Sequence, residues 1–263
     1  MIRQWYRMDL HVHSCLSPCA EDDMTPHNIV QMAALEQMDM LAVTDHNAVG
    51  NSLETVVIAE DFGIACLYGM EVETREGVHV LVYLPNAFSL LSLEAFIQEH
   101  LPMRSHRPDV WGRQLVVGSD GELTEYPWLL SQGTQLSLTE LDRKLASLGG
   151  LLVPAHADRR SYGLLSLLGH MPAKLNAAAV ELVDVNQSLP LDHVIVMNSD
   201  AHSLDAMVRP RQRYTYLWGD APTFEELALG LAGRAGRKVV VGLDEGIGTA
   251  FAGFGGKFRK GRS

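Results

Sequence analysis

Short apolar runs recur along the chain, and each contains or precedes a residue that can bind a metal ion. The runs are rich in valine, leucine and isoleucine and are bounded by polar residues. Runs of this length and composition are typical of strands buried on both faces of a parallel sheet. They predict strands at residues 7–12, 40–44, 64–70, 78–83, 151–155 and 193–198.

Segments with a helical apolar stripe lie between these runs. Thr25 and Pro26 open a helix predicted over residues 28–38, because threonine caps helices and proline suits their first turn. Further helices are predicted over residues 138–148, which a Gly-Gly pair ends, and over residues 223–231. Strands that alternate with helices indicate an α/β protein, and at 263 residues a barrel of parallel strands is expected.

Two segments break this alternation. Residues 85–133, after the fourth strand, hold two tryptophans and a Gly-Ser-Asp-Gly turn, and we interpret them as an insertion or lid. Residues 246–263 are glycine-rich with basic residues at the end, and they predict a tail. The barrel is therefore expected within residues 1–245.

Candidate metal ligands gather at or near the carboxyl ends of the predicted strands, where barrel active sites assemble. His11 and His13 are two residues apart, so on a strand their side chains share one face and can converge on one ion. A His-x-His pair alone is weak evidence, but further histidines and carboxylates hold equivalent positions. They are His46, Glu71, His156, Asp200 and His202, and the fourth run carries His79.

The motifs DLHVHS, TDH, GMEVE, AH at 155–156 and SDAH at 199–202 closely resemble those of the PHP family of phosphoesterases. The resemblance runs from about residue 8 to residue 243. It implies a distorted (β/α)7 barrel that hydrolyses a phosphoester by metal-activated hydroxide. The implied substrate is a small soluble anion, such as a nucleotide or a metabolite phosphate.

The resemblance also implies three divalent metal ions. The first is expected at His11, His13, Glu71 and Asp200, and Glu71 is expected to bridge to a second ion at His79 and His156. The third is expected at His46, His202 and a carboxylate from the loop after the first strand. The residues implied to surround the reacting atoms are His11, His13, Glu71, Asp200 and His202.

The loop after the first strand departs from the family pattern. Many relatives carry Ser-Asp-Gly there, whereas this chain reads SPCAEDDMTP from Ser17 onward. Any of the acidic residues 21–23 can supply the carboxylate, and Asp22 is our prediction. Cys15 and Cys19 form a C-x3-C pair without a second cysteine pair, so we interpret each as a small buried hydrophobe.

Imidazole and carboxylate ligands together favour zinc, manganese or iron over calcium. A phosphate group also attracts guanidinium, which binds it with two hydrogen bonds. Arg159 and Arg160, just after His156, are the leading candidates, followed by Arg209.

Other polar residues have weaker cases. Asp9 shares a strand face with His11 and is a candidate to orient a ligand. Asp45 is expected to stabilise its loop, and Glu181 and Asp184 are weak candidates to line the cleft.

Two alternative functions remain open. An amidohydrolase-like metal hydrolase also begins with His-x-His, but it usually needs a carbamylated lysine at a strand end. No lysine lies at a predicted strand end before residue 144. A metal-binding sensor or accessory module without catalysis is the other alternative, and only turnover separates it from an enzyme.

Composition narrows the range of partners. The chain has no apolar run long enough to cross a membrane and no signal core at its start, and three cysteines are too few for a disulfide framework. A cytoplasmic location is therefore expected. The net charge of −11 disfavours nucleic acid as a partner, whereas three divalent cations would attract a small phosphorylated substrate. The sequence does not determine the oligomeric state.

Overall fold

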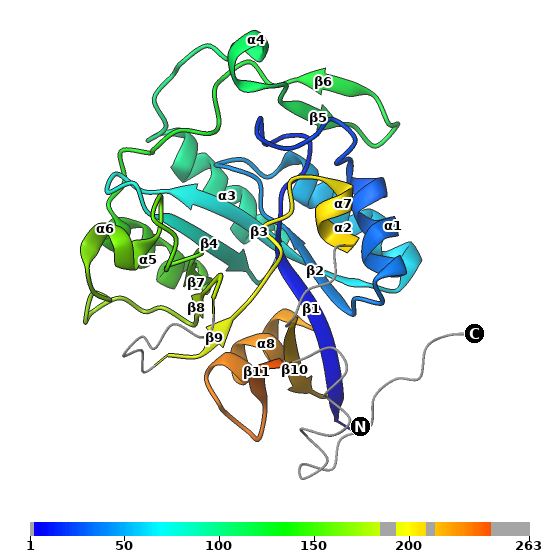
Figure 1. Ribbon diagram of the computed structural model, residues 1–263, viewed down its shortest axis with the longest axis vertical. Coiled ribbons are helices and arrows are strands. Elements are labelled where there is room, and N and C mark those ends of the chain that lie inside the picture. Colours follow the sequence, from blue (N-terminus) through cyan, green and yellow to red (C-terminus); the bar gives the residue numbers. More distant parts are fainter. Residues whose placement is uncertain (1–2, 185–192, 209–213, 243–263) are drawn as a thin grey trace.

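A seven-stranded sheet curls into a half-barrel at the centre of the molecule (Figure 1). The computed structural model describes residues 3–184, 193–208 and 214–242, so Arg209 and the predicted tail lie outside the described residues. The strands follow the order β11-β10-β1-β2-β3-β4-β7. They are β1 (Gln4–Val12), β2 (Met40–Val43), β3 (Ala65–Glu73), β4 (His79–Leu84), β7 (Leu151–Pro154), β10 (Tyr214–Gly219) and β11 (Lys238–Gly242).

The α/β class and the distorted barrel are confirmed, but the strand directions differ from the predicted parallel arrangement. β1, β2 and β3 are parallel, whereas β4 is antiparallel to both β3 and β7, and β10 is antiparallel to β1. The five residues between β3 and β4 are too few for a crossover, which needs about a dozen, so the chain reverses in a hairpin. Gly77 has a φ of 81° in this turn, a left-handed value that glycine adopts without strain.

Helices pack against both the outer and the inner face of the curled sheet, and three of them match the predictions. Thr25 caps α1 (Pro26–Leu35), Ser137 forms a capping box at α5 (Leu138–Leu148), and Thr223 caps α8 (Phe224–Leu231). α1 and α2 (Gly50–Phe62) pack together beside β1 and β2, and α3 (Ala87–Gln98) and α5 pack beside β4 and β7. The short helices are α4 (Pro108–Trp111), α6 (Leu164–Leu168) and α7 (Leu204–Val208).

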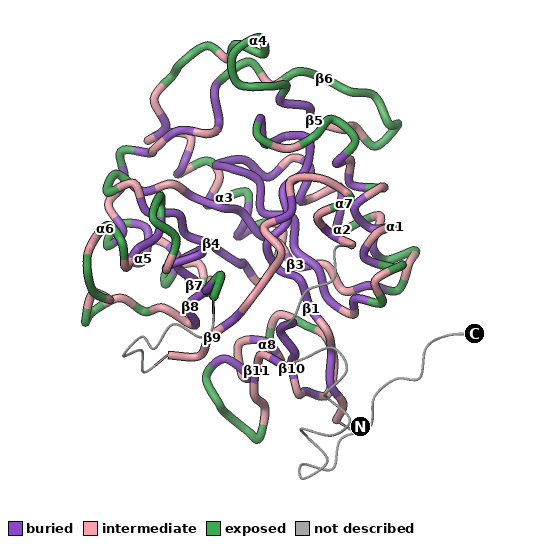
Figure 2. The backbone as a smooth tube through the Cα atoms, viewed as in Figure 1, coloured by how far each residue is buried: buried purple, intermediate pink, exposed green. Residues whose placement is uncertain are grey.

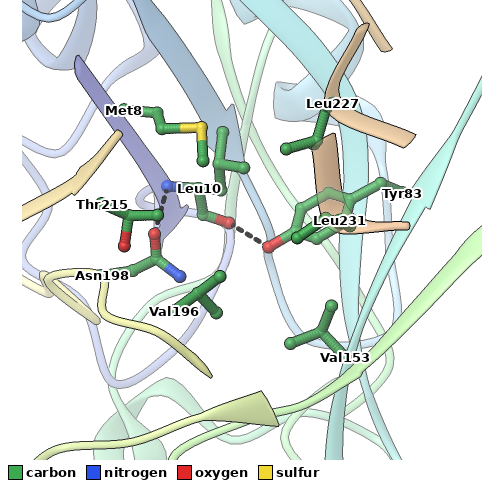
Figure 3. A pocket seen from close by; sticks show the side chains of 9 residues that line it. All are labelled: Met8, Leu10, Tyr83, Val153, Val196, Asn198, Thr215, Leu227 and Leu231. Atoms are coloured by element: carbon green, nitrogen blue, oxygen red, sulfur yellow. Dashed lines mark hydrogen bonds between the residues drawn. The ribbon is translucent and has the colours of Figure 1, made fainter. Parts of the chain in front are cut away.

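Apolar side chains fill the inside of the half-barrel and close it from below. Leu227 and Leu231 of α8 pack against Leu10 of β1 within this core. The cavity that they line is only about 10 Å³, room for about one water molecule (Figure 3). The Tyr83 hydroxyl donates to the carbonyl oxygen of Leu10 at 2.7 Å, which ties β4 to β1 across this interior. This packed interior therefore closes the half-barrel beneath the residues at the upper end of the sheet.

The segment 85–133 begins as part of the core. α3 buries Leu90, Leu93 and Ile97 against the sheet. The rest, with α4 and the hairpin of β5 (Leu115–Val117) and β6 (Leu123–Glu125), lies at the top in Figure 1. α4 and β6 are exposed, whereas the strands beneath them are buried (Figure 2). The division into barrel and lid stays a prediction.

A short parallel pair of strands, β8 (Val180–Glu181) and β9 (Ile195–Val196), extends the structure beside β7. Within the described residues, no helix is both long and apolar enough to span a membrane.

Candidate metal centre

Metal-binding side chains converge at the edge of the sheet where β1, β2 and β3 end. β1 carries His11 and leads into His13, and His46 follows β2. His79 begins β4, and because β4 is antiparallel, its first residue lies opposite Glu73 at the end of β3. The other members of the convergent group are Glu71 of β3, His156 after β7, and Asp200 and His202 after β9.

Glu71 lies at the centre of this group, with 1% of the residue exposed. Both carboxylate oxygens face imidazole nitrogens from several sides, as a carboxylate that bridges neighbouring cations must do. We call Glu71 and the five histidines around it the Glu71 cluster. From Oε1 the nitrogen distances are 3.0 Å (His79), 3.4 Å (His156) and 3.5 Å (His11), and from Oε2 they are 3.1 Å (His46) and 3.3 Å (His13).

Asp200 joins the cluster from a loop tied to β1. Its Oδ1 lies 3.2 Å from Nε2 of His11 and 3.4 Å from Nε2 of His13. Its backbone N–H donates to the carbonyl oxygen of His11, and its φ is 51°. His156 also has a positive φ, 29°. Positive φ is uncommon for residues other than glycine, and it clusters at functional sites.

Cys19 lies where the sequence analysis expected a carboxylate. Its Sγ is 3.4 Å from Nε2 of His46, and one donor atom from each of Cys19, His13, His46 and His202 lies within 4.8 Å of the others. We call these four residues the Cys19 group. The backbone N–H of Glu21 donates to the carbonyl oxygen of His202 at 2.9 Å, which fastens the Cys19 loop to the His202 loop.

The structure does not bring Asp22 into this group. The three acidic residues 21–23 are exposed, and the Asp22 carboxylate pairs with Arg113 at 3.3 Å. The interpretation of Cys19 as a buried hydrophobe is wrong, because Cys19 is exposed, whereas Cys15 is buried as expected. The extra residues of the loop carry its acidic side chains outward.

Glu181, a weak candidate in the sequence, supports the ligands from behind. It is 3% exposed, and its carboxylate lies 3.0 Å from Nδ1 of His11. The same carboxylate accepts a hydrogen bond from the backbone N–H of His156 at 2.8 Å and another from the Asn198 amide at 2.8 Å. A carboxylate on the second ring nitrogen fixes the orientation and tautomer of a ligand histidine. Only its position after a short apolar run hinted at this role.

Two aspartates hold the loops that carry the ligands. Asp9 accepts a hydrogen bond from the backbone N–H of Ser199, which positions the Asp200 loop, and its role in orienting a ligand histidine stays a prediction. Asp45 stabilises its neighbourhood as expected, since it accepts hydrogen bonds from Ser14 and from Ser17 Oγ. Ser17 Oγ in turn lies 2.9 Å from Nδ1 of His13.

The metal-free cluster is held together by opposite charges. Burial alone would raise the pKa of Glu71, but His79 and His11 outweigh it and hold that pKa well below its usual value. Burial likewise opposes protonation of His13 and His79, yet the carboxylates beside them raise their pKa values to about 8 and about 9. For His202, burial and the nearby His13 lower the pKa to about 4. Metal binding at neutral pH must therefore displace protons.

The donor set fits divalent metal ions. Zinc–nitrogen and zinc–oxygen bonds are about 2.0–2.2 Å long, which places adjacent ligand atoms about 2.9–3.5 Å apart at right or tetrahedral angles. The five distances around Glu71 fall within this range. Five imidazoles also converge on one buried carboxylate, and Asp200 adds a second carboxylate beside His11 and His13. The residues present therefore suit cations placed between them.

The three predicted phosphate-binding arginines differ in position. Arg159 contacts the site, with Nη2 at 2.8 Å from Oδ2 of Asp200 and 44% of its side chain exposed. Arg160 is exposed. Arg209 lies outside the described residues.

The profile of the PHP domain family matches residues 9–217, most of the chain and all of the metal-binding side chains described above. The chain belongs to the PHP domain family. Members of this family include metal-dependent phosphoesterases.

Individual relatives match shorter stretches. A 3′,5′-nucleoside bisphosphate phosphatase from Chromobacterium violaceum is 36% identical over 74 residues, which cover 28% of this chain and 25% of that protein. An uncharacterized protein of Methanocaldococcus jannaschii is 29% identical over 86 residues, 30% of this chain and 50% of that protein. The chain thus spans half or less of these two relatives.

A similar fold occurs in the lesion-specific endonuclease Q from Pyrococcus furiosus, with a TM-score of 0.65 and 20% identity. The match covers 89% of this chain and 57% of the endonuclease. A complex of endonuclease Q with a 27-mer duplex that has an abasic lesion at its active site gives a TM-score of 0.67, also at 20% identity, over 89% of this chain and 58% of that one.

These neighbours correct the expectation that nucleic acid is an unlikely partner. Endonuclease Q shares this fold and is bound to a 27-mer DNA duplex in one of these structures, so the fold does not exclude a nucleic-acid partner. The argument from net charge failed because it averages over the whole surface, whereas binding depends on the local field around bound cations and arginines.

Proposed function

We propose that this chain is a phosphoesterase that uses three divalent metal ions, zinc, manganese or iron, in the Glu71 cluster and beside it. The observation that carries the proposal is one buried carboxylate facing five imidazoles, with Asp200 completing the set. A lysine-bridged, amidohydrolase-like centre is disfavoured because Glu71 already occupies the bridging position. We also propose a cytoplasmic location, since the three cysteines are free thiols.

Bound divalent cations would supply a water of lowered pKa and positive charge for the phosphate and leaving oxygens. The chain's own residues determine where this chemistry takes place. His11, His13 and Asp200 define one position, and His79 and His156 define another across Glu71. The negative charge of Glu71 offsets the repulsion between neighbouring cations. Glu181 keeps His11 and the backbone of His156 in place, so the geometry exists before substrate arrives.

The open side of the site suits a phosphate group. Arg159 reaches Asp200 with half of its side chain in solvent, so its remaining guanidinium N–H groups can meet an entering phosphate. His202 also faces this side, with 32% of its side chain exposed. We therefore propose a small soluble phosphoester as substrate, either a nucleotide or a metabolite phosphate. The local similarity to a nucleoside bisphosphate phosphatase supports the nucleotide.

A nucleic-acid strand is the second candidate substrate. Trp111 and Trp128 lie on the segment above the Cys19 loop and are 40% and 36% exposed. Gly112 in this segment packs directly on the backbone of Pro18, which places the tryptophans at the same end of the molecule as the site. Exposed aromatic rings beside a phosphoesterase centre can stack unpaired bases.

A substrate panel tests the proposal. Chelator-treated protein, reloaded with manganese, zinc or iron, is assayed on chromogenic mono- and diesters, nucleoside mono- and bisphosphates, and an oligonucleotide with an abasic site. The matched control is the double variant His11→Ala, Asp200→Ala. We expect metal-dependent turnover in the native chain and none in the variant. Metal binding without turnover of any ester would instead favour a sensor or accessory module.

A further inference from the structure

The Cys19 group is a second cluster of donor atoms beside the Glu71 cluster, and it contains a sulfur atom. His13 and His46 belong to both clusters. The Nδ1 atom of His46 faces Glu71 at 3.1 Å, and its Nε2 atom faces the Cys19 Sγ at 3.4 Å. His46 is 7% exposed, so a buried imidazole nitrogen points at the thiol. His202 comes from a loop far away in the sequence, and its ring stacks on that of His13 with centroids 4.3 Å apart.

We propose that Cys19 binds a divalent metal ion together with His46 and His202, and that its sulfur replaces the carboxylate which the family pattern places in this loop. The inference deepens the proposed function, since it names the ligands of one of its ions. On binding, the S–H bond of Cys19 breaks, a sulfur–metal bond forms, and one proton leaves to solvent.

The distances fit this role. A zinc–sulfur bond is about 2.3 Å and a zinc–nitrogen bond is about 2.0–2.1 Å, so at angles of about 100–110° the two ligand atoms lie about 3.3–3.6 Å apart. The observed separation of Cys19 Sγ and His46 Nε2 is 3.4 Å. The four donor atoms of the group lie within 4.8 Å of one another, a spread that one ion can span.

The loop leaves no acidic side chain in this place. Residues 21–23 are exposed, and Asp22 is paired with Arg113 on the outside. Asp45 binds Ser14 and Ser17, and the Glu21 backbone binds His202, so the loop is fixed on both sides of Cys19. The thiol is thereby held toward the histidines.

A thiolate changes which metal the site prefers. Soft sulfur ligands select zinc, iron and cobalt over magnesium, calcium and manganese, which favour oxygen. The Glu71 cluster offers only nitrogen and oxygen. We therefore expect the two parts of the centre to differ in metal preference, with the Cys19 position favouring zinc or iron.

Cobalt(II) provides the direct test, because a thiolate ligand gives a sulfur-to-cobalt charge-transfer absorption in the near ultraviolet. The full chain is freed of metal with a chelator and titrated with cobalt. We expect the band in the native chain and in the matched control Cys66→Ser, and its loss in Cys19→Ser. Cys19→Asp should bind the same number of cobalt ions as the native chain without the band.

Alkylation of the native chain provides a second measurement that needs no variant. Cys19 is exposed, so iodoacetamide should modify it in the metal-free protein, and zinc should slow that modification at least about tenfold, as read by peptide mass. A band that persists in Cys19→Ser, or alkylation of Cys19 that zinc does not slow, would overturn the proposal. Turnover without the band refutes only the role of Cys19, whereas a band without turnover refutes only the proposed function.

Discussion

The Glu71 cluster and the Cys19 group are neighbours, yet they are built differently. Glu71 and His11 lie on strands of the central sheet, and both are at most 1% exposed. Cys19 and His202 lie on loops, and they are exposed or part-exposed. The Glu71 cluster offers only nitrogen and oxygen donors, whereas the Cys19 group adds sulfur.

This difference shows where the chain is free to change. A ligand on a strand is fixed by the sheet ladder, and its neighbours are packed on both sides. A loop tolerates extra residues, because its backbone runs over the surface. The extra residues in the loop after β1 therefore allow one ligand type to replace another without disturbing the Glu71 cluster. The following predictions run from the largest expected effect to the smallest.

Glu71→Gln should disrupt metal binding and turnover at the Glu71 cluster. It removes the carboxylate that all five histidines face, and losing one partner of a buried charge network costs about 3–5 kcal/mol of folding stability. Because no bridging carboxylate remains, we also expect weaker metal binding and a fall in turnover of about 10²-fold or more, which corresponds to at least about 2.7 kcal/mol in activation free energy. Steady-state kinetics and metal analysis measure both effects. Glu60→Gln, on the exposed surface of α2, is the matched control, and equal losses in both variants would contradict the role of Glu71.

Glu181→Gln should lower the metal affinity of the Glu71 cluster without removing a ligand. The amide cannot orient His11 as a carboxylate does, and changes behind a metal ligand typically reduce metal affinity about 10–100-fold. Competition with a chelator of known affinity measures this loss. Asp184→Asn, three residues on and exposed, should leave the affinity unchanged. Unchanged affinity in Glu181→Gln would show that the ring orientation of His11 does not depend on it.

Arg159→Ala should weaken substrate binding at the open side of the site and leave metal binding nearly unchanged. A hydrogen bond to a charged group contributes about 1.5–3 kcal/mol, and the half-exposed position of Arg159 favours the lower end. We expect KM to rise about tenfold with little loss of metal. Arg160→Ala is the comparison, with a smaller expected effect. Equal KM values for the native chain and Arg159→Ala would show that Arg159 does not contribute to substrate binding.

The metal-free chain should lose stability as the pH rises from about 6.5 to about 9. The raised pKa values of His13 and His79, about 8 and about 9, mean that folding favours their protonated forms. That contribution is complete below the unfolded pKa of about 6.5 and disappears as the pH passes the folded values. Glu71 and Asp200, with lowered pKa values, stay charged throughout this window.

Thermal unfolding in chelator measures this dependence. We expect a lower Tm at about pH 9 than at about pH 6.5, at about 2–4 °C for each kcal/mol lost. Added metal should reverse the trend, because ligands bind metal in their deprotonated form. A Tm that does not change with pH in chelator would contradict the charge network described for the metal-free cluster.

The sequence was sufficient to predict the fold class and the convergent side chains of the strands. His11, Glu71 and His156 lie together because each occupies the same end of a strand, and strand periodicity is visible in the sequence. The direction of β4 was predicted wrongly, although the seven residues between the predicted strands 64–70 and 78–83 are too few for a parallel crossover. His79 reaches the site because β4 begins there rather than ends there.

The loop and the supporting residues were harder to predict. Asp22 was predicted from among the acidic residues 21–23, but the path of a loop with extra residues depends on contacts such as those with Arg113 and His202. Glu181 acts through His11, 170 positions away, and no local pattern reports such a contact. Residues 87–98 form α3, which was not predicted, because its apolar residues lie on several faces and leave no clear stripe in the sequence.

Anomalous X-ray diffraction from crystals grown with zinc or manganese tests the central claim most directly, because it locates the ions themselves. We predict peaks on two sides of the Glu71 carboxylate, within bonding distance of its oxygens, and a further peak beside Cys19 when zinc is used. Ions bound elsewhere, or no ion within reach of Glu71, would contradict the account of this site as a metal centre.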